Sequence, residues 1–130
     1  KPLTRFNADI SSWQTSGVTN MKYMFERASA FDQPVSFDTS SVTDMQGMFY
    51  IAKKFNGPVS SFDTSKVTNM ANMFYDSKFN QPLSFDTSSV NTSMYGMFAF
   101  TSAFNQPLSF DTSRVTNMVY MFGAASAFNQ

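Results

Sequence analysis

Pairs of methionines recur along the chain and are the first side chains whose type and spacing could do chemistry. All ten methionines fall into pairs spaced Met-x-x-Met, as in Met21 and Met24. Clustered thioether sulfurs are good ligands for Cu(I). However, each second methionine is followed directly by a phenylalanine, and the same apolar face needs both methionines. We therefore favour packing in a core over copper binding.

A column of aspartates could supply hard oxygen ligands for Ca²⁺. Its members are Asp38, Asp63, Asp86 and Asp111, and each begins an Asp-Thr-Ser phrase. Each repeat offers only one acid here, and Gln14 stands at the corresponding position of the first repeat. Because Asp-Thr-Ser is a usual Asx turn, we expect carboxylates that accept backbone N–H bonds, with a Ca²⁺ site as the weaker alternative.

Threonines form two further columns, and regular rows of threonine on a flat face would suggest ice binding. The columns are Thr15, Thr39, Thr64, Thr87, Thr112 and Thr19, Thr43, Thr68, Thr116. The two columns lie four residues apart around an expected turn, and Asn91 interrupts the second. We expect these hydroxyls to bond to backbone groups, and ice binding is the less favoured alternative.

The composition argues against most catalytic sites and several classes of partner. The chain has no cysteine and no histidine, so zinc, iron–sulfur, thiol-nucleophile and Ser-His-Asp sites each lack a required member. We therefore expect no enzyme, no cofactor and no metal. The net charge is zero, which disfavours nucleic acid as a partner. No apolar run approaches the roughly 18 to 20 residues of a transmembrane segment.

A repeat of 24 or 25 residues must position all these side chains. Aligning the chain on one phenylalanine gives the column Phe6, Phe31, Phe55, Phe79, Phe104 and Phe128. A period of this length is typical of stacked repeats, in which no unit can bury its apolar face alone. We predict a single segment, 1–130, with units at about 6–30, 31–54, 55–78, 79–103 and 104–127, while 128–130 starts a further unit.

Each unit reads as a short strand followed by a short helix. In the second unit Val35 and Phe37 alternate like a strand, whereas Met45, Met48 and the two apolar residues at 49 and 52 have helical spacing. A column of helix-capping residues precedes the methionines: Asn20, Asp44, Asn69, Ser93 and Asn117. We predict an α/β repeat that forms an open right-handed solenoid of short parallel strands and short helices. The phenylalanine and methionine columns should be buried, and Phe100 should be a surface or interface residue. The glutamines Gln33, Gln81 and Gln106 should be exposed, as should the lysines and arginines.

The phrases VTNMKYMFERASAF, VTDMQGMFYIAKKF and VTNMVYMFGAASAFNQ, together with FNQPLSFDTS, closely resemble a known bacterial surface-protein repeat. That repeat is common in mycoplasma surface lipoproteins and is related to the BspA-type leucine-rich repeats. The resemblance implies a leucine-rich-repeat-like solenoid on a cell surface or a secreted protein, with a role in attachment or none assigned. Phenylalanine and methionine stand where the wider class has leucine, and no asparagine ladder follows the expected strand.

Together these observations predict a non-enzymatic, extracellular or cell-surface module that acts as a scaffold and adhesion surface for a protein or glycan. Repetition provides area instead of a concentrated site, and the amides expected to face a ligand are Asn56, Asn80, Gln81, Asn105 and Gln106. The alternative is a structural spacer or a self-assembling filament element. We also expect self-association through uncapped ends, because exposed backbone edges invite pairing.

Overall fold

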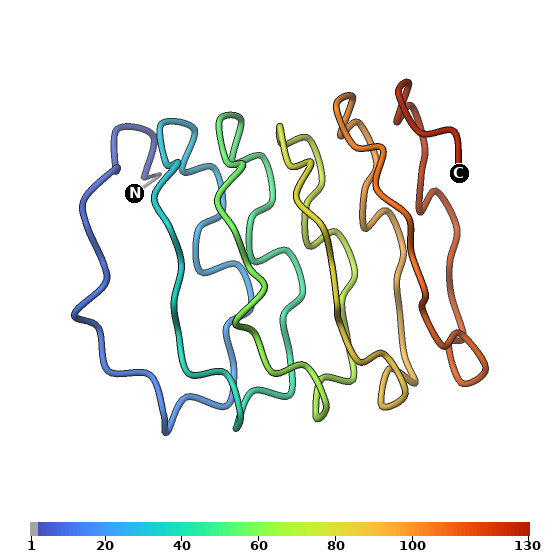
Figure 1. Cartoon of the computed structure of the whole chain (residues 1–130), viewed down its shortest axis with the longest axis horizontal. Helices are drawn as coiled ribbons and strands as arrows, with labels where there is room; N and C mark the ends of the chain where they lie inside the picture. The colour runs from blue at the N-terminus through green and yellow to red at the C-terminus, as the bar shows by residue number, and fades with distance from the viewer. Residues whose placement is uncertain (1–2) are drawn as a thin grey trace.

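The chain winds into successive coils that lie side by side, with the two termini at opposite ends of the row (Figure 1). The computed structural model describes residues 3–130. The predicted exposure of Lys1 therefore lies outside the described residues.

The predicted strands and helices are wrong. Residues 3–130 contain no helix and no strand of more than one residue. Within the described residues, the β-bridges between neighbouring coils are isolated, parallel and confined to one column: Asn20↔Asp44, Asp44↔Asn69, Asn69↔Ser93 and Ser93↔Asn117. The fold is therefore not an α/β solenoid, and its coils do not have the strand and helix of a leucine-rich repeat.

The segments predicted as helices are runs of overlapping β-turns. We call residues 21–28, 45–52, 70–77, 94–101 and 118–125 the turn segments. In the first, the N–H groups of Met24, Glu26 and Ala28 donate to the carbonyls three residues earlier, at 3.1–3.2 Å. An α-helix bonds across four residues instead.

Backbone angles rule out a helix in the same segments. The third and seventh residues of every turn segment have a positive φ: Tyr23, Arg27, Gly47, Ile51, Asn72, Asp76, Gly96, Phe100, Tyr120 and Ala124. A positive φ at the third residue of a β-turn is the mark of type II, whereas every residue of an α-helix has a φ near −60°. Each segment thus contains two outward turn tips, formed by its second and third and by its sixth and seventh residues.

The helical spacing of apolar residues has a different cause in this backbone. Because the turn tips point outward, the first, fourth, fifth and eighth residues face the core. In the second turn segment these are Met45, Met48, Phe49 and Ala52, all fully buried. The burial pattern expected of a helix is therefore present without the helix.

Hydrogen bonds to the next coil alternate with the turn bonds. The N–H groups of Met45, Gly47, Phe49 and Ile51 donate to carbonyls of residues 69, 71, 73 and 75 at 2.8–3.1 Å. The N–H of Gln46 donates to Asp44 Oδ1 at 2.8 Å, and the remaining three make turn bonds. Every backbone donor of this segment is satisfied, as buried amides require. The predicted capping column, which includes Asp44, makes the expected side-chain bond although no helix follows it.

The core is a stack of phenylalanine rings. Within one coil the rings of Phe49 and Phe55 stack at 3.8 Å, and Phe49 stacks on Phe74 of the next coil at 5.7 Å. Burial of each such phenylalanine side chain stabilises the fold by about 1.5–3 kcal/mol. The predicted burial of the phenylalanine and methionine columns is confirmed for the interior coils.

Two exposure predictions have different outcomes. The described lysines and arginines are exposed as predicted, and so is Phe100. The prediction that Gln33, Gln81 and Gln106 are exposed is wrong, because all three are half-buried.

Candidate functional site

The asparagines predicted to face a ligand form a ladder between coils. Asn56 Oδ1 accepts the backbone N–H of Asn80 at 2.8 Å, and Asn80 Oδ1 accepts that of Asn105 at 2.9 Å. Asn105 Oδ1 continues the ladder by accepting the N–H of Asn129 at 3.0 Å. An asparagine ladder is therefore present, although it precedes the segment predicted as a strand instead of following it.

The predicted glutamines flank this ladder. Gln106 Nε2 donates to both the backbone oxygen and Oδ1 of Asn80, each at 3.1 Å. Gln81 is half-buried in the equivalent column. The structure thus brings the predicted ligand-facing amides together, and hydrogen bonding between coils explains why these amides recur.

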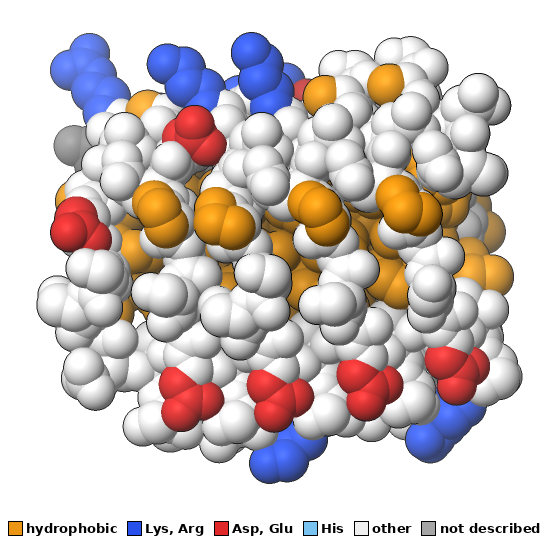
Figure 2. All heavy atoms as spheres, viewed as in Figure 1, with side chains coloured by type: hydrophobic (Ala, Val, Ile, Leu, Met, Phe, Trp, Pro, Cys, Tyr) orange, Lys and Arg blue, Asp and Glu red, His pale blue; other side chains and the backbone are white. Residues whose placement is uncertain are grey.

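The aspartate column caps turns. Ser40 donates to Asp38 Oδ1 through its N–H at 3.1 Å and through its hydroxyl at 2.7 Å. Both bonds lower the pKa of Asp38 below its usual value, and the bond from the serine hydroxyl has the larger effect. The pKa values of Asp63, Asp86 and Asp111 are lowered in the same way by the serine two residues on. Figure 2 shows acidic side chains in a regular row along one edge of the molecule. Within residues 3–130, no three acidic side chains gather where they could hold a metal ion.

The threonine hydroxyls bind backbone carbonyls of neighbouring coils. Thr39 Oγ1 donates to the carbonyl of Asp63 at 3.0 Å in the first column, and Thr92 Oγ1 donates to that of Thr68 at 2.6 Å in the second. Thr92 therefore belongs to the second column, which Asn91 was expected to interrupt. Asn91 is an extra residue inserted before it. The hydroxyls that make these bonds join neighbouring coils and are not free to bind ice.

The methionine sulfurs lie mostly in the core. Met45 and Met73 are fully buried, and Met24 is half-buried against the core. Met118, in the last turn segment, is exposed. Packing therefore accounts for the paired spacing in the interior coils.

An aromatic surface forms on the outer side of the turn segments, where sequence analysis placed no site. All five tyrosines of the chain occupy outward turn tips, together with Phe100, and we call these residues the tyrosine face. Tyr120 is 67% exposed, Phe100 51% and Tyr95 38%. Soluble proteins rarely gather large exposed aromatic side chains without a binding role.

A cavity of about 350 Å³ opens in this face between two aromatic pairs. Tyr75 and Phe100 have ring centroids 5.3 Å apart with planes inclined at 57°, and Tyr95 and Tyr120 lie 6.3 Å apart at 70°. Ala99 completes the lining. None of the lining side chains carries a charge at neutral pH, and burial raises the pKa of Tyr75 above its usual value.

The other end of the tyrosine face is already engaged. The Tyr23 hydroxyl accepts a hydrogen bond from Gln46 Nε2 at 3.0 Å, and the Lys22 amine lies 5.5 Å from the Tyr23 ring centroid. That ring covers Gly47, where an added Cβ would lie 2.2 Å from Tyr23 Cε1. Tyr23 and Tyr50 pair at 6.3 Å, but Tyr50 also lies 4.9 Å from Tyr75 of the cavity lining, so Tyr23 alone offers a control for the open cavity.

The sequence does contain a signal for this cavity. Tyr95 and Phe100 are the only aromatic residues at their positions of the turn segment, whereas Tyr75 shares its position with Tyr50 and Tyr120 shares its position with Tyr23. Side chains that break an otherwise regular repeat are candidates for function instead of stacking. Only Phe100 was identified as irregular from the sequence.

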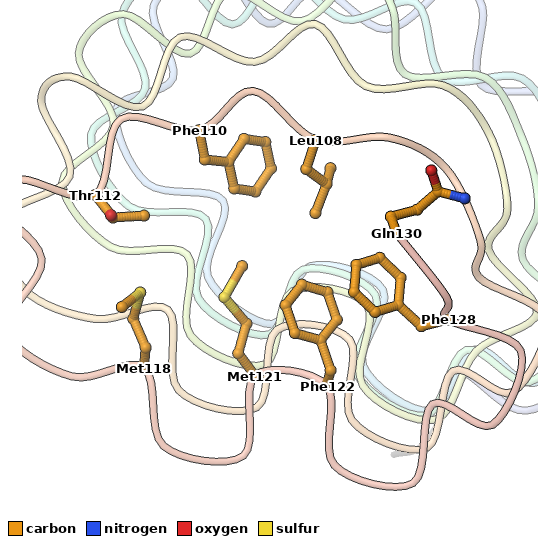
Figure 3. Close-up of a pocket in the computed structure, with 8 residues that line it drawn as sticks. All are labelled: Leu108, Phe110, Thr112, Met118, Met121, Phe122, Phe128 and Gln130. Atoms are coloured by element: carbon orange, nitrogen blue, oxygen red, sulfur yellow. The ribbon is translucent and has the colours of Figure 1, made fainter.

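A second cavity, of about 320 Å³, lies against the last coil (Figure 3). Phe110, Met121, Phe122 and Phe128 point into it with Leu108. These residues continue the columns that are buried in preceding coils, so we assign this cavity to the core. Among the residues that the structure describes, no helix is long and apolar enough to cross a membrane.

Comparison with known proteins gives one family. The family model described as "Mycoplasma protein of unknown function, DUF285" matches residues 1–84 and again residues 57–130. No curated protein and no solved structure matches the chain.

Proposed function

Since the chain belongs to the family described as Mycoplasma protein of unknown function, DUF285, we propose that it is a non-enzymatic repeat module of a cell-surface or secreted protein. The two overlapping matches together cover the whole chain. They agree with the mycoplasma-type part of the sequence resemblance and supply no activity. We further propose that the module binds a protein or glycan ligand.

The cavity of the tyrosine face is the observation that carries the binding proposal. Tyrosine combines a large apolar ring with a hydroxyl, and such residues dominate the energetics of recognition. The three most exposed aromatic residues next to the cavity are Tyr95, Phe100 and Tyr120. Neither the stacking of coils nor the phenylalanine core requires these exposed rings.

A binding comparison of two variants tests this function. The protein, Tyr95→Ser/Tyr120→Ser and Tyr23→Ser are each applied to glycan arrays, to host extracellular proteins and to cells. We expect binding by the unaltered protein, loss in the first variant and retention in the second. Equal thermal stability of the two variants excludes unfolding as the cause of a loss.

The result also distinguishes the alternative. Absence of binding in all three assays would refute the binding proposal and leave a spacer or filament element. Self-association remains a prediction, which sedimentation velocity over a range of protein concentrations tests.

A further inference from the structure

We propose that the cavity of the tyrosine face binds a single neutral pyranose ring of a glycan. This inference rests on the proposed binding function and names the class of ligand. The cavity is the one lined by Tyr75, Tyr95, Ala99, Phe100 and Tyr120.

The chemistry of the walls matches the two kinds of surface on a sugar ring. A pyranose has C–H groups on its faces and hydroxyls around its edge. The aromatic pairs Tyr75–Phe100 and Tyr95–Tyr120 present ring surfaces on which C–H groups can stack. Three of these four residues also carry a phenolic hydroxyl, which can donate to and accept from a sugar hydroxyl.

The absence of charge from the lining favours a neutral sugar. No lysine or arginine lines the cavity to neutralise a carboxylate or sulfate. The closest acid in sequence, Asp76, is already paired with Lys53. An anionic sugar would lose hydration on entering such a cavity without gaining a cationic partner, so its binding is disfavoured.

The size and closure of the cavity favour one ring over an extended chain. A volume of about 350 Å³ lies near the lower end of the range of ligand pockets, roughly 300–1,000 Å³. Towards the N-terminal end the Tyr50 ring packs against Tyr75, with ring centroids 4.9 Å apart, so an aromatic ring closes that side of the cavity. A proline-rich peptide needs a groove longer than this cavity and is therefore the less favoured occupant.

Titration of the ¹⁵N-labelled protein with small probes, followed by NMR, tests the proposal. The probes are the methyl glycosides of β-galactose, β-glucose and α-mannose, N-acetylneuraminic acid as the anionic control, and decaproline. We expect saturable shifts at Tyr95, Phe100 and Tyr120 with at least one neutral glycoside, and a Kd on the order of millimolar because a single ring buries little surface.

Matched variants locate the binding. Tyr120→Ser is expected to raise the Kd by about ten-fold, the effect of removing one aromatic partner, whereas Tyr23→Ser should leave it unchanged. An equal effect of both variants, or saturable binding of the anionic sugar alone, would overturn the proposal.

The failure of this inference can be told apart from failure of the proposed function. Saturable binding of decaproline at the same residues without any glycoside would refute the sugar and leave the binding module standing. The same holds if no probe binds here but a protein ligand is lost in Tyr95→Ser/Tyr120→Ser. If no probe binds and no ligand is found on arrays or cells, both proposals fall.

Discussion

The substitution Arg27→Gly is expected to stabilise the protein. Arg27 has φ = 57°, and a non-glycine residue in this region costs about 1–2 kcal/mol. Glycine removes that strain, but its greater conformational freedom in the unfolded chain lowers the free energy of unfolding by about 0.5–1 kcal/mol. The N–H···O bond from residue 27 to Tyr50, 2.7 Å long, is retained, so the net gain is about 0.5–1 kcal/mol.

The neighbouring position provides the control. Glu26 has a negative φ, so Glu26→Gly adds the entropy without relieving strain and should destabilise by about 0.5–1 kcal/mol. Both variants remove the Arg27–Glu26 ion pair, which is 3.6 Å long and exposed and therefore contributes little.

Urea denaturation followed by tyrosine and tryptophan fluorescence measures both effects. We expect the midpoint to rise for Arg27→Gly and to fall for Glu26→Gly. In a helix both substitutions would destabilise by about 1 kcal/mol. Two lowered midpoints would therefore refute the assignment of residues 21–28 as consecutive turns.

Two further predictions concern contacts between coils, and a third concerns a turn within one coil. Gly57→Ala should destabilise by about 1–3 kcal/mol, because the new Cβ would lie 2.7 Å from a backbone oxygen of the neighbouring coil, whereas Gly17→Ala, with nothing within 4 Å, should leave thermal stability unchanged. Asn80→Ala should lower the unfolding free energy by about 0.5–1.5 kcal/mol, because the N–H of Asn105 loses its acceptor, and Asn91→Ala should change it by less than about 0.5 kcal/mol; similar urea midpoints would contradict the ladder. The pKa of Asp63 is lowered in the fold, so its contribution to stability is present above about pH 4 and is lost as the pH falls through the folded pKa. Melting temperatures should therefore fall less steeply below about pH 4 in Asp63→Asn than in the unaltered protein, and parallel curves would exclude this contribution.

The repeat itself and its core could be predicted from the sequence. The columns that contain Phe49 and Phe74 are regular, and regular apolar columns must be buried because each unit depends on its neighbours. Asp44 was correctly expected to accept a backbone N–H near the start of its segment. These inferences depend on side-chain type and period, which the sequence displays directly.

The backbone conformation could not be predicted from the same pattern. Met45, Met48, Phe49 and Ala52 face one side in a helix and also in two successive type II turns. Ile51 has φ = 58°, a conformation that β-branched residues rarely adopt, so propensity pointed away from the observed turn. The hydrogen bond from the Ile51 N–H to the next coil maintains this conformation, and that bond forms only when the coils are stacked.

The cavity was missed for a related reason. Tyr75 and Tyr95 come from different turn segments and different positions, and only the stacking of outward tips brings them to one cavity. Conversely, Asn80 and Asn105 recur regularly, which suggested a repeated ligand surface, yet their side-chain oxygens join the coils. Regular columns therefore mark contacts between coils, and among the residues of the candidate site only Tyr95 and Phe100 depart from the repeat.

The central claim is that outward turn tips, and not helices, display the tyrosine face. NMR measurement of the backbone φ angles of residues 45–52 tests it most directly. The structure predicts positive φ at Gly47 and Ile51 and negative φ at Met48 and Phe49. Negative, helical φ values throughout these residues would contradict the claim and, with it, the arrangement of aromatic side chains on which the binding proposals depend.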